Sequence, residues 1–514
     1  MFCSKRDGLW LSRFVFICIV YKSLLLLFLT LALLSHPAKA DYQFRFTEKC
    51  SKAYQQIIGL RLKPAAQLLA EEKAADPNNL VPYFLENYID FFVLFFNEDQ
   101  KEYNQRIGHK AERLKLMKQG PSNSPFTVFC QSIIHMQWAA VESKFGNRWA
   151  AGWDFRDAYK HALSNEQKFP SFSPNWMITG PIQMVSATIP QSLKWLASLL
   201  GIQGDMPGGK QKLDRFLKSN DAWARFFQQE GVFYQCYLQF YLLNQPDDAL
   251  AFIEQHRLDV VNNHLFTYMA ANLNLNNKNS RKTQEIVLGR NQSAEYMATP
   301  VWDFELGYAK LYHLETDAIG HFQRFLKSFA GNYYVKDVWL KLGYAYLIAG
   351  NMPQYKYCMQ QVRLKGTTVS DADKRALKEA KMQKEPNLVL LKARLLSDGG
   401  YPTEAMEILE GKTSRDFTDP TEQLEFMYRV GRIYDDLKQY DKALQAYDAT
   451  IQTGRQRTEY FAARAALQAG LICEKRGQVS KAISYFKTCI EMEGHDYEES
   501  LEQRAKAGLA RCKK

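Results

Sequence analysis

The segment from Gly204 to Gln211 comes closest to a ligand-binding motif. It reads Gly-Asp-Met-Pro-Gly-Gly-Lys-Gln, which matches the spacing of the phosphate-binding loop GxxxxGK[ST] up to its last position. That loop needs a preceding strand, free backbone amides and a Ser or Thr hydroxyl for Mg²⁺. Here Leu193–Leu200 has the pattern of a helix, Pro207 removes one amide, and Gln211 replaces the hydroxyl. We therefore predict a turn that opens a helix, and no nucleotide or other cofactor.

The histidines and cysteines do not have the spacing of a metal site or a catalytic nucleophile. The chain contains no H-E-x-x-H, C-x-x-C or G-x-S-x-G sequence, and His313 and His321 flank a predicted turn. Seven cysteines after residue 40 are odd in number and widely separated, so we expect buried free thiols. A Cys473–Cys489 bridge in an oxidising compartment is the alternative. No catalytic residue and no metal ligand is predicted.

Tryptophans crowd one part of the N-terminal half: Trp138, Trp149, Trp153, Trp176 and Trp195. Exposed aromatic rings beside carboxylates would suit a sugar cleft, and the alternative function is therefore a helical enzyme or glycan-binding protein that uses this half. Degenerate helical repeats also bury aromatic residues between their helices. No pair of carboxylates stands out near the tryptophans, so we favour core packing.

The charge pattern argues against nucleic acid as a partner. The chain has 66 Lys and Arg residues against 55 Asp and Glu, a formal net charge of +11. Basic and acidic residues are interspersed without a long run of one sign, which indicates a solvated surface with room for a local site for an acidic ligand.

The elements that must position any site are helices. Nearly every segment after residue 40 has helical periodicity, and none alternates apolar and polar residues as a strand does. In the C-terminal half, a small residue is followed twelve positions later by another small residue, and four positions after that by a bulky apolar one. Three such triplets are clear: Ala393, Ala405 and Leu409; Gly431, Ala443 and Tyr447; Gly470, Ala482 and Phe486.

This spacing resembles the tetratricopeptide repeat, a pair of antiparallel helices with a period of about 34 residues. The resemblance implies an all-α, α-solenoid fold of helix-turn-helix repeats that acts as a protein-binding scaffold. The position held by the first small residue of each triplet recurs along the chain, although a tyrosine occupies it once: Tyr237, Ala271, Gly307, Gly343, Ala393, Gly431 and Gly470. The longer interval after Gly343 predicts an extra helix over Ser370–Met382. We therefore expect a solenoid over residues 222–497 and a capping helix over 498–514.

Residues 41–221 have a degenerate form of the same helical pattern. Four phenylalanines within Tyr83–Phe96 predict a core helix, with a membrane-contacting face as the alternative. Residues 150–217, especially Ile189–Leu196 followed by Leu199–Asp205, faintly resemble tetratricopeptide proteins of the inclusion-body clearance type. This likeness implies an all-helical adaptor and brings no catalytic residue. The general similarity to exported tetratricopeptide proteins of Gram-negative bacteria is closer.

The tetratricopeptide resemblance also implies where a partner binds, because the first helix of each pair lines the concave groove. The groove positions of the last three repeats hold Asn387, Arg394, Tyr428, Arg429, Arg432, Arg464 and Gln468. Arginine binds carboxylates with two parallel hydrogen bonds, so we predict an acidic segment or a peptide C-terminus as the ligand. Self-neutralised pairs such as Glu425–Arg429 are the alternative interpretation. Comparable positions upstream predict an aromatic groove: Phe304, Tyr308, Tyr312, Leu340 and Tyr344.

The N-terminus has the pattern of a secretory signal peptide. Basic residues precede the apolar run Leu24–Leu34, and Ala38-Lys39-Ala40 follows it. We predict cleavage after Ala40 and export to the periplasm or cell envelope of a Gram-negative bacterium. The alternative joins Phe14–Tyr21 to the later run as one uncleaved anchor, and only then would the protein contact a membrane. Lys22 within that span counts against it.

Overall fold

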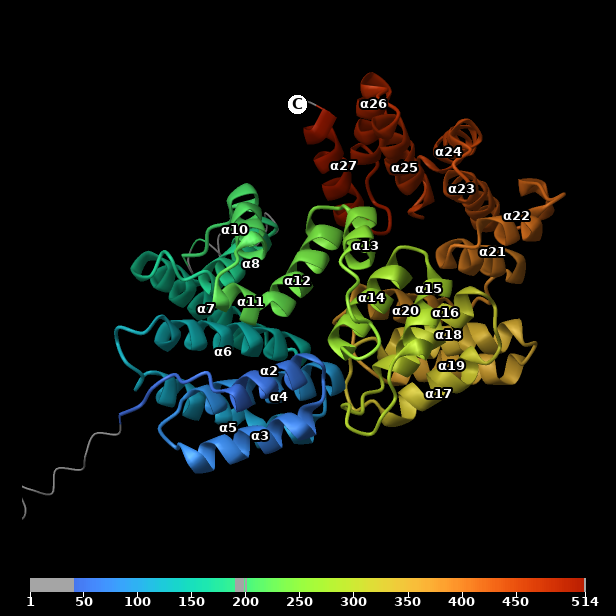
Figure 1. The fold of residues 1–514 in the computed structure, drawn as a ribbon. Coiled ribbons are helices and arrows are strands. Elements are labelled where there is room, and N and C mark those ends of the chain that lie inside the picture. The colour runs from blue at the N-terminus through green and yellow to red at the C-terminus, as the bar shows by residue number, and fades with distance from the viewer. Residues whose placement is uncertain (1–40, 190–197, 199–200, 513–514) are drawn as a thin grey trace, which may run out of the picture.

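The protein is a curved array of helices in a computed structural model that describes residues 41–189, 198 and 201–512 (Figure 1). Within these residues the only non-helical pairing is an isolated β-bridge between Gln43 and Asn79. The all-α solenoid class predicted from the sequence is confirmed. The predicted signal peptide, residues 1–40, lies outside the described residues, as do residues 190–197 and 199–200 of the segment that resembles the inclusion-body clearance type.

The N-terminal region forms a helical layer whose main core runs from Cys50 to Phe227 and includes Leu265 of the solenoid, beside a small cluster around Met184 and Leu213. Phe92 and Phe96 are buried in this core, so the helix around them is the predicted core helix. The helices of this region are α2 (Glu48–Ile58), α3 (Leu62–Ala75), α4 (Val81–Asn97), α5 (Gln100–Met117), α6 (Pro125–Lys144), α7 (Arg148–Lys168), α8 (Pro174–Ala187), α10 (Met206–Lys218) and α11 (Ala222–Phe226).

The remaining chain stacks helix pairs into a solenoid whose core is a series of overlapping clusters. The pairs are α12 (Gln228–Tyr237, extended by the π-helix η2, Leu238–Leu242) with α13 (Pro246–Gln255), α14 (His264–Asn276) with α15 (Ser280–Gly289), α16 (Val301–Tyr312) with α17 (Ala318–Ser328), α18 (Val335–Ile348) with α19 (Met352–Leu364), α21 (Leu388–Gly399) with α22 (Pro402–Leu409), α23 (Pro420–Asp436) with α24 (Tyr440–Gly454), and α25 (Phe461–Lys475) with α26 (Val479–Ile490).

Three further elements complete the solenoid. Helix α20 (Asp371–Met382) is the extra helix expected in the long interval after Gly343, and it packs against α18 and α19. The 3-10 turn η3 (Ser414–Asp416) precedes α23. Helix α27 (Glu498–Cys512) packs against α25 and α26 at the C-terminal end of the array (Figure 1).

The small residues of the repeat sit where two helices approach each other most closely. A Cβ atom placed on Gly470 would lie 2.6 Å from Cδ1 of Phe486, and one on Gly431 would lie 2.6 Å from Cδ1 of Tyr447. Gly307 has the same relation to Phe322. The packing inferred from the spacing is therefore present: the aromatic ring of the second helix lies against the backbone of the first.

We expect Gly470→Ala to destabilise the protein by about 1–3 kcal/mol, because the added methyl group displaces the buried Phe486 ring. Guanidinium-induced unfolding followed by circular dichroism measures the change. Gly108→Ala in α5 is the matched control, since no heavy atom lies within 4 Å of its new Cβ, and alanine there should stabilise the helix by about 0.5–1 kcal/mol. Equal effects of the two substitutions would contradict the packing role of Gly470.

The N-terminal region packs directly against the solenoid rather than extending it as a free arm (Figure 1). The turn after α2 accepts two backbone hydrogen bonds, from His264 N to Gly59 O (3.3 Å) and from Met297 N to Leu60 O (2.8 Å). Arg61 in the same turn forms an ion pair with Glu295. Side chains from the two regions can therefore line one site.

The solenoid is wound tightly enough for distant repeats to touch. The turn between α14 and α15 meets the turn between α21 and α22, where a Cβ on Gly400 would lie 1.8 Å from the carbonyl oxygen of Lys278. The Lys278 ammonium lies 2.7 Å from both carboxylate oxygens of Asp436 on α23. Ser397 donates to the same carboxylate at 2.8 Å.

The motifs considered in the sequence can be located in the structure. Asp205 caps α10 and accepts a hydrogen bond from Gly208 N at 2.9 Å, so the segment that resembles a phosphate loop opens a helix. The seven cysteines among the described residues are free thiols. Over residues 41–189 and 201–512, no cluster of His, Cys, Asp and Glu suits a metal ion. None of the helices described has the length and apolar character needed to cross a membrane.

Candidate functional site

The seven predicted groove residues fall into two groups. The side chain of Asn387 caps α21 by accepting a hydrogen bond from Val389 N (3.1 Å), and its amide nitrogen donates to Glu422 (3.1 Å). Tyr428, Arg429 and Gln468 are buried. Arg429 donates to Oε1 of Glu425 from two nitrogens, at 3.0 and 2.9 Å, so this pair is self-neutralised as the alternative interpretation proposed. The second group, Arg394, Arg432 and Arg464, stays half-buried. Nothing in the structure tests a binding role for any of the seven, and that role stays a prediction.

Arg432 and Arg464 lie near a third arginine, Arg504 of α27. We call these three residues the arginine cluster. Partial burial and the positive charges of Arg464 and Arg432 lower the pKa of Arg504. Arg432 lies 4.0 Å from Asp436, and the nearby Tyr428 and Tyr447 together with Asp436 and Asp435 raise its pKa in spite of burial. Among the described residues no ion pair is recorded for Arg464 or Arg504, and Nε of Arg464 is buried without a hydrogen-bond partner. The unneutralised charge of the cluster is therefore that of Arg464 and Arg504.

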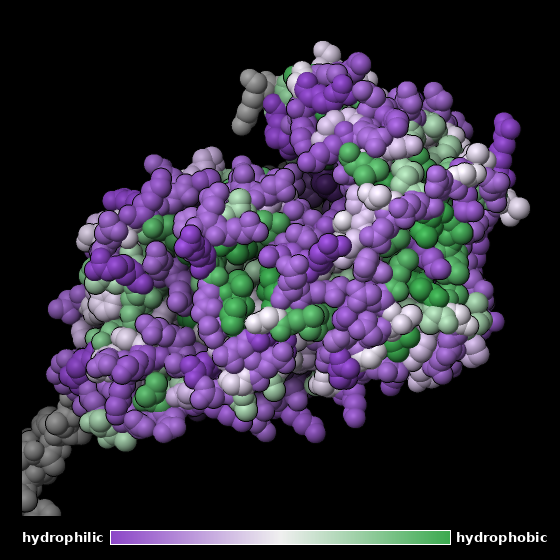
Figure 2. Space-filling view, turned by 45° about the vertical axis from the view of Figure 1, so that its right-hand side comes forward, coloured by the Kyte–Doolittle hydropathy of each residue, from purple (hydrophilic) through white to green (hydrophobic). Residues whose placement is uncertain are grey.

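The carboxylate of Asp398 shows how strongly cationic this face is. Burial alone would raise the pKa of Asp398, yet the pKa is lowered because Arg429, Lys278, Arg394 and Arg432 surround the carboxylate. Figure 2 shows a hollow with hydrophilic walls beneath the lobe that carries the C-terminal helices. An anionic group would relieve the repulsion that Arg504 experiences from Arg464 and Arg432.

The tryptophans of the N-terminal half do not share one environment. Trp138 is buried and donates to Oδ1 of Asn87 at 3.0 Å, and Trp176 is buried beneath the guanidinium of Arg215, 3.8 Å from its ring. Trp149 and Trp153 of α7 are 72% and 52% exposed, and Trp195 lies outside the described residues. The expected core packing therefore holds for two of the four tryptophans that are described.

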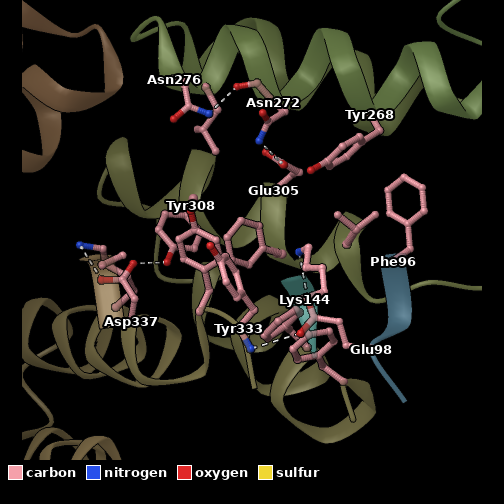
Figure 3. Close-up of a pocket in the computed structure, with 18 of the residues that line it drawn as sticks. Phe96, Glu98, Lys144, Tyr268, Asn272, Asn276, Glu305, Tyr308, Tyr333 and Asp337 are labelled. Atoms are coloured by element: carbon pink, nitrogen blue, oxygen red, sulfur yellow. Dashed lines mark hydrogen bonds and ion pairs between the residues drawn. The ribbon is translucent and has the colours of Figure 1, made fainter. Parts of the chain in front are cut away.

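A pocket of about 500 Å³ opens between the N-terminal region and the solenoid, and we call it the aromatic pocket (Figure 3). Helices α14, α16, α18 and α20 supply one side of it, while α4 and α6 supply the other. Its walls are mainly aromatic: Phe95, Phe96, Tyr241, Tyr268, Phe304, Tyr308, Tyr312, Phe325, Phe329, Tyr333 and Tyr334. Of the five aromatic-groove residues predicted from the sequence, Phe304, Tyr308 and Tyr312 line the pocket, whereas Leu340 and Tyr344 are buried in the core.

Glu305 on α16 is the unusual group in this pocket. The residue is 0% exposed, and only its Oε1 has a partner, Nδ2 of Asn272 at 3.1 Å. Its Oε2 is buried without a hydrogen-bond partner, and no ion pair to Glu305 occurs among the described residues. Burial raises the pKa of Glu305 to about 7. Figure 3 shows the carboxylate between Asn272 and Tyr268, facing the pocket.

The other charged groups of the pocket have partners. Oε1 of Glu98 lies 2.9 Å from the Lys144 ammonium, which also sits 4.5 Å from the centre of the Tyr333 ring. At the opposite end, Asp337 accepts a hydrogen bond from Tyr308 and lies 3.5 Å from Arg375 and 3.9 Å from Lys341. Glu305 is therefore the one carboxylate lining the pocket whose charge has no opposing cation.

The wall of the pocket also contains a constrained residue. Tyr334 has a φ of 62°, a left-handed conformation that costs a non-glycine residue about 1–3 kcal/mol. The buried carboxylate of Asp373 holds it there by accepting a hydrogen bond from Tyr334 N at 2.9 Å. The ring consequently stands over the pocket, 5.6 Å from that of Phe304, and remains 37% exposed.

The polar half of this site was not predicted from the sequence. Glu305 had no clear signal in the sequence, because Trp302–Leu306 contains a second acid, Asp303, which is partly exposed and pairs with Arg324. Glu98 and Lys144 had no signal either, because they come from the degenerate region and reach the pocket only through its packing on the solenoid.

Comparison with known proteins identifies part of the solenoid. The Tetratricopeptide repeat family model matches residues 424–451 and 463–496, which cover most of α23 to α26. No curated protein matches the chain. Among solved structures, one similar chain comes from the crystal structure of the APC/C hetero-tetramer Cut9-Hcn1, with 12% identity over 88% of this chain and 95% of that chain and a TM-score of 0.28.

Proposed function

We propose that this protein is an exported, non-enzymatic scaffold that holds an extended segment of a partner protein in the concave groove of its solenoid. Tetratricopeptide repeats form protein-binding surfaces of this kind, and two of them are present at residues 424–496. The arginine cluster carries the proposal, because its three arginines gather from three helices and two of them, Arg464 and Arg504, have no ion pair among the described residues. The partner segment is acidic where it meets these arginines.

Export is the second part of the proposal. It rests on the apolar run Leu24–Leu34 between basic residues and Ala38-Lys39-Ala40, which is the pattern of a cleaved signal peptide. In the envelope of a Gram-negative bacterium, the partner would be an envelope component or another exported protein.

We expect a fluorescein-labelled hexaglutamate peptide to bind the protein, and hexaglutamine not to bind. Arg464→Gln combined with Arg504→Gln should weaken hexaglutamate binding at least tenfold, because each lost charge-assisted hydrogen bond is worth about 1.5–3 kcal/mol. Fluorescence anisotropy at 50 and 150 mM salt measures the affinity, which should fall as salt rises.

The matched control removes two arginines that already have acidic partners. Arg455 pairs with Glu491 at 3.3 Å, and Arg511 pairs with Glu474 at 2.7 Å, so Arg455→Gln combined with Arg511→Gln changes the net charge equally. We expect this variant to retain binding within about twofold, since exposed pairs contribute little. An equal loss in both double variants would show that hexaglutamate responds only to net charge, and the arginine cluster would not be the site.

A further inference from the structure

We propose that the aromatic pocket receives a lysine side chain of the partner segment, with the lysine ammonium on Oε2 of Glu305 and its carbon stem between the aromatic rings. This inference rests on the proposed scaffold function and adds the residue type that anchors the partner. A basic anchor here is also distinct from the acidic contact at the arginine cluster.

The unpartnered oxygen of Glu305 gives the pocket its chemistry. A buried carboxylate oxygen without a donor is costly to a folded protein, and nearly all such atoms are satisfied by a protein group, a water or a ligand. Asn272 satisfies Oε1 alone. An ammonium group can donate to Oε2 and also neutralise the charge, which none of the cations that line the pocket does.

The walls suit the rest of a lysine side chain. Burial raises the pKa of Tyr268 and the nearby carboxylate of Glu305 adds to the rise, while the Tyr268 ring packs 5.0 Å from that of Phe96. Tyr241 at the edge is 50% exposed. Aromatic faces attract cations, and the protein's own Lys144 already occupies two such faces, 4.9 Å from Phe95 and 4.5 Å from Tyr333. A flexible four-carbon stem can reach a carboxylate at the base of such a passage.

The pocket is electrostatically continuous with the arginine cluster, which favours a peptide over a free small cation. Arg375 at the edge of the pocket lies near Arg394 as well as Asp337, and Arg394 and Arg432 of the arginine cluster both lie near the carboxylate of Asp398. Arg394 is in turn influenced by Glu425 on α23. One face of charged side chains therefore leads from the pocket towards α23, and an extended segment with a basic anchor and a following acidic stretch matches that order of charge.

The test compares two pools of fluorescein-labelled octapeptides of mixed sequence. One pool has a fixed central lysine, and the other has norleucine, which keeps the four-carbon chain and lacks the ammonium. We expect the lysine pool to bind about tenfold more tightly. Glu305→Gln should abolish that preference, because a neutral amide cannot pair with the ammonium, and Tyr241→Leu should reduce it several-fold. Glu254→Gln, an exposed glutamate of α13, should leave it unchanged.

Glu305→Gln is expected to fold. A folded-state pKa of about 7, against 4.5 for an ordinary glutamate, means that the native state favours the neutral acid. Native stability therefore falls as the pH rises from 4.5 through 7, and the neutral glutamine should be at least as stable as the parent at pH 8. Thermal melting at pH 8 checks this.

Affinity for the lysine pool should also rise several-fold between pH 6 and 7.5, as the carboxylate of Glu305 loses its proton. Tyr241 and Tyr334, whose pKa values are about 12, stay neutral in this range, and so does Tyr268. Lys341, with a pKa lowered to about 8 by burial, remains mostly charged, as does Arg375, and Asp337 is ion-paired with both. Burial also raises the pKa of Glu98, so Glu98 could contribute to the pH dependence. Glu305→Gln distinguishes the two carboxylates, because it should remove the increase in affinity only if Glu305 causes it.

Each outcome bears on a different statement. Equal binding of the lysine and norleucine pools would overturn the lysine site and leave the scaffold function standing. Absence of binding by both pools, together with no binding of hexaglutamate, would overturn both. If Nα-acetyl-lysinamide alone bound as tightly as the lysine pool, the ligand would be a small cation and the peptide assignment would be wrong.

Discussion

Gly400→Ala is expected to destabilise the protein by about 3–5 kcal/mol and to loosen its superhelix, which is a large effect for one methyl group. Gly400 ends α21 with a φ of 87°, and its new Cβ would lie 1.8 Å from the carbonyl oxygen of Lys278. That oxygen belongs to the backbone of a turn more than a hundred residues earlier, so it cannot rotate away as a side chain would. Relief requires the two turns of the solenoid to separate, and the Lys278–Asp436 ion pair lies at this contact.

Gly411→Ala separates the two causes of this effect. Gly411 has a similar φ of 70°, but no heavy atom lies within 4 Å of its new Cβ. Its substitution should cost only the strain of a left-handed alanine, about 1–3 kcal/mol. Small-angle scattering should show a larger radius of gyration for Gly400→Ala and an unchanged one for Gly411→Ala. Equal unfolding midpoints and equal radii would mean that the contact between the turns contributes nothing.

The helix pairs were predictable because their signal is local. Gly431 and Tyr447, or Gly470 and Phe486, lie within one repeat, and their fixed spacing reports a close approach between two consecutive helices. The same reasoning found the extra helix α20, since an interval too long for one repeat must hold another element. Nothing local reports the contact of Gly400 with Lys278, which depends on the accumulated twist of several repeats.

The candidate site was predictable only where it follows the repeat. Phe304, Tyr308 and Tyr312 occupy groove positions of one repeat, and all three line the aromatic pocket. Counting positions also placed Tyr428 and Arg429 in the groove; both are buried, and the Arg429 guanidinium donates to Glu425. Arg504 was missed since the final helix was interpreted as a cap without groove positions.

The aromatic pocket forms where the N-terminal region packs against the solenoid. Glu230 on α12 connects the two regions through buried hydrogen bonds. Its buried carboxylate accepts hydrogen bonds from Tyr54 of α2 (3.1 Å), Tyr88 of α4 (2.9 Å) and Tyr234 of α12 (2.6 Å). Burial raises the pKa of Glu230, and the three hydroxyl donors oppose that rise. Burial and the nearby carboxylate in turn keep the pKa of each tyrosine well above its ordinary value, so all three remain donors.

Glu230→Ala should therefore cost about 3–5 kcal/mol, because it leaves three buried hydroxyl groups without an acceptor as well as a cavity. Tyr54→Phe alone should cost about 1–2 kcal/mol in the parent protein. In the Glu230→Ala background the same change should be neutral or stabilising, since it removes an unsatisfied hydroxyl. Guanidinium unfolding of the four proteins completes the double-mutant cycle.

Additive costs in that cycle would mean that Tyr54 and Glu230 act independently, and the carboxylate would not join α2 to α12. Coupling of more than about 1 kcal/mol would support the joint. Because Phe96 and Glu98 of the pocket follow Tyr88 along α4, a loosened joint should also weaken the lysine-pool binding of Glu230→Ala. Hexaglutamate binding at the arginine cluster, which is built from α23, α25 and α27, should persist in the same variant. The two parts of the groove would then be shown to depend on different supports.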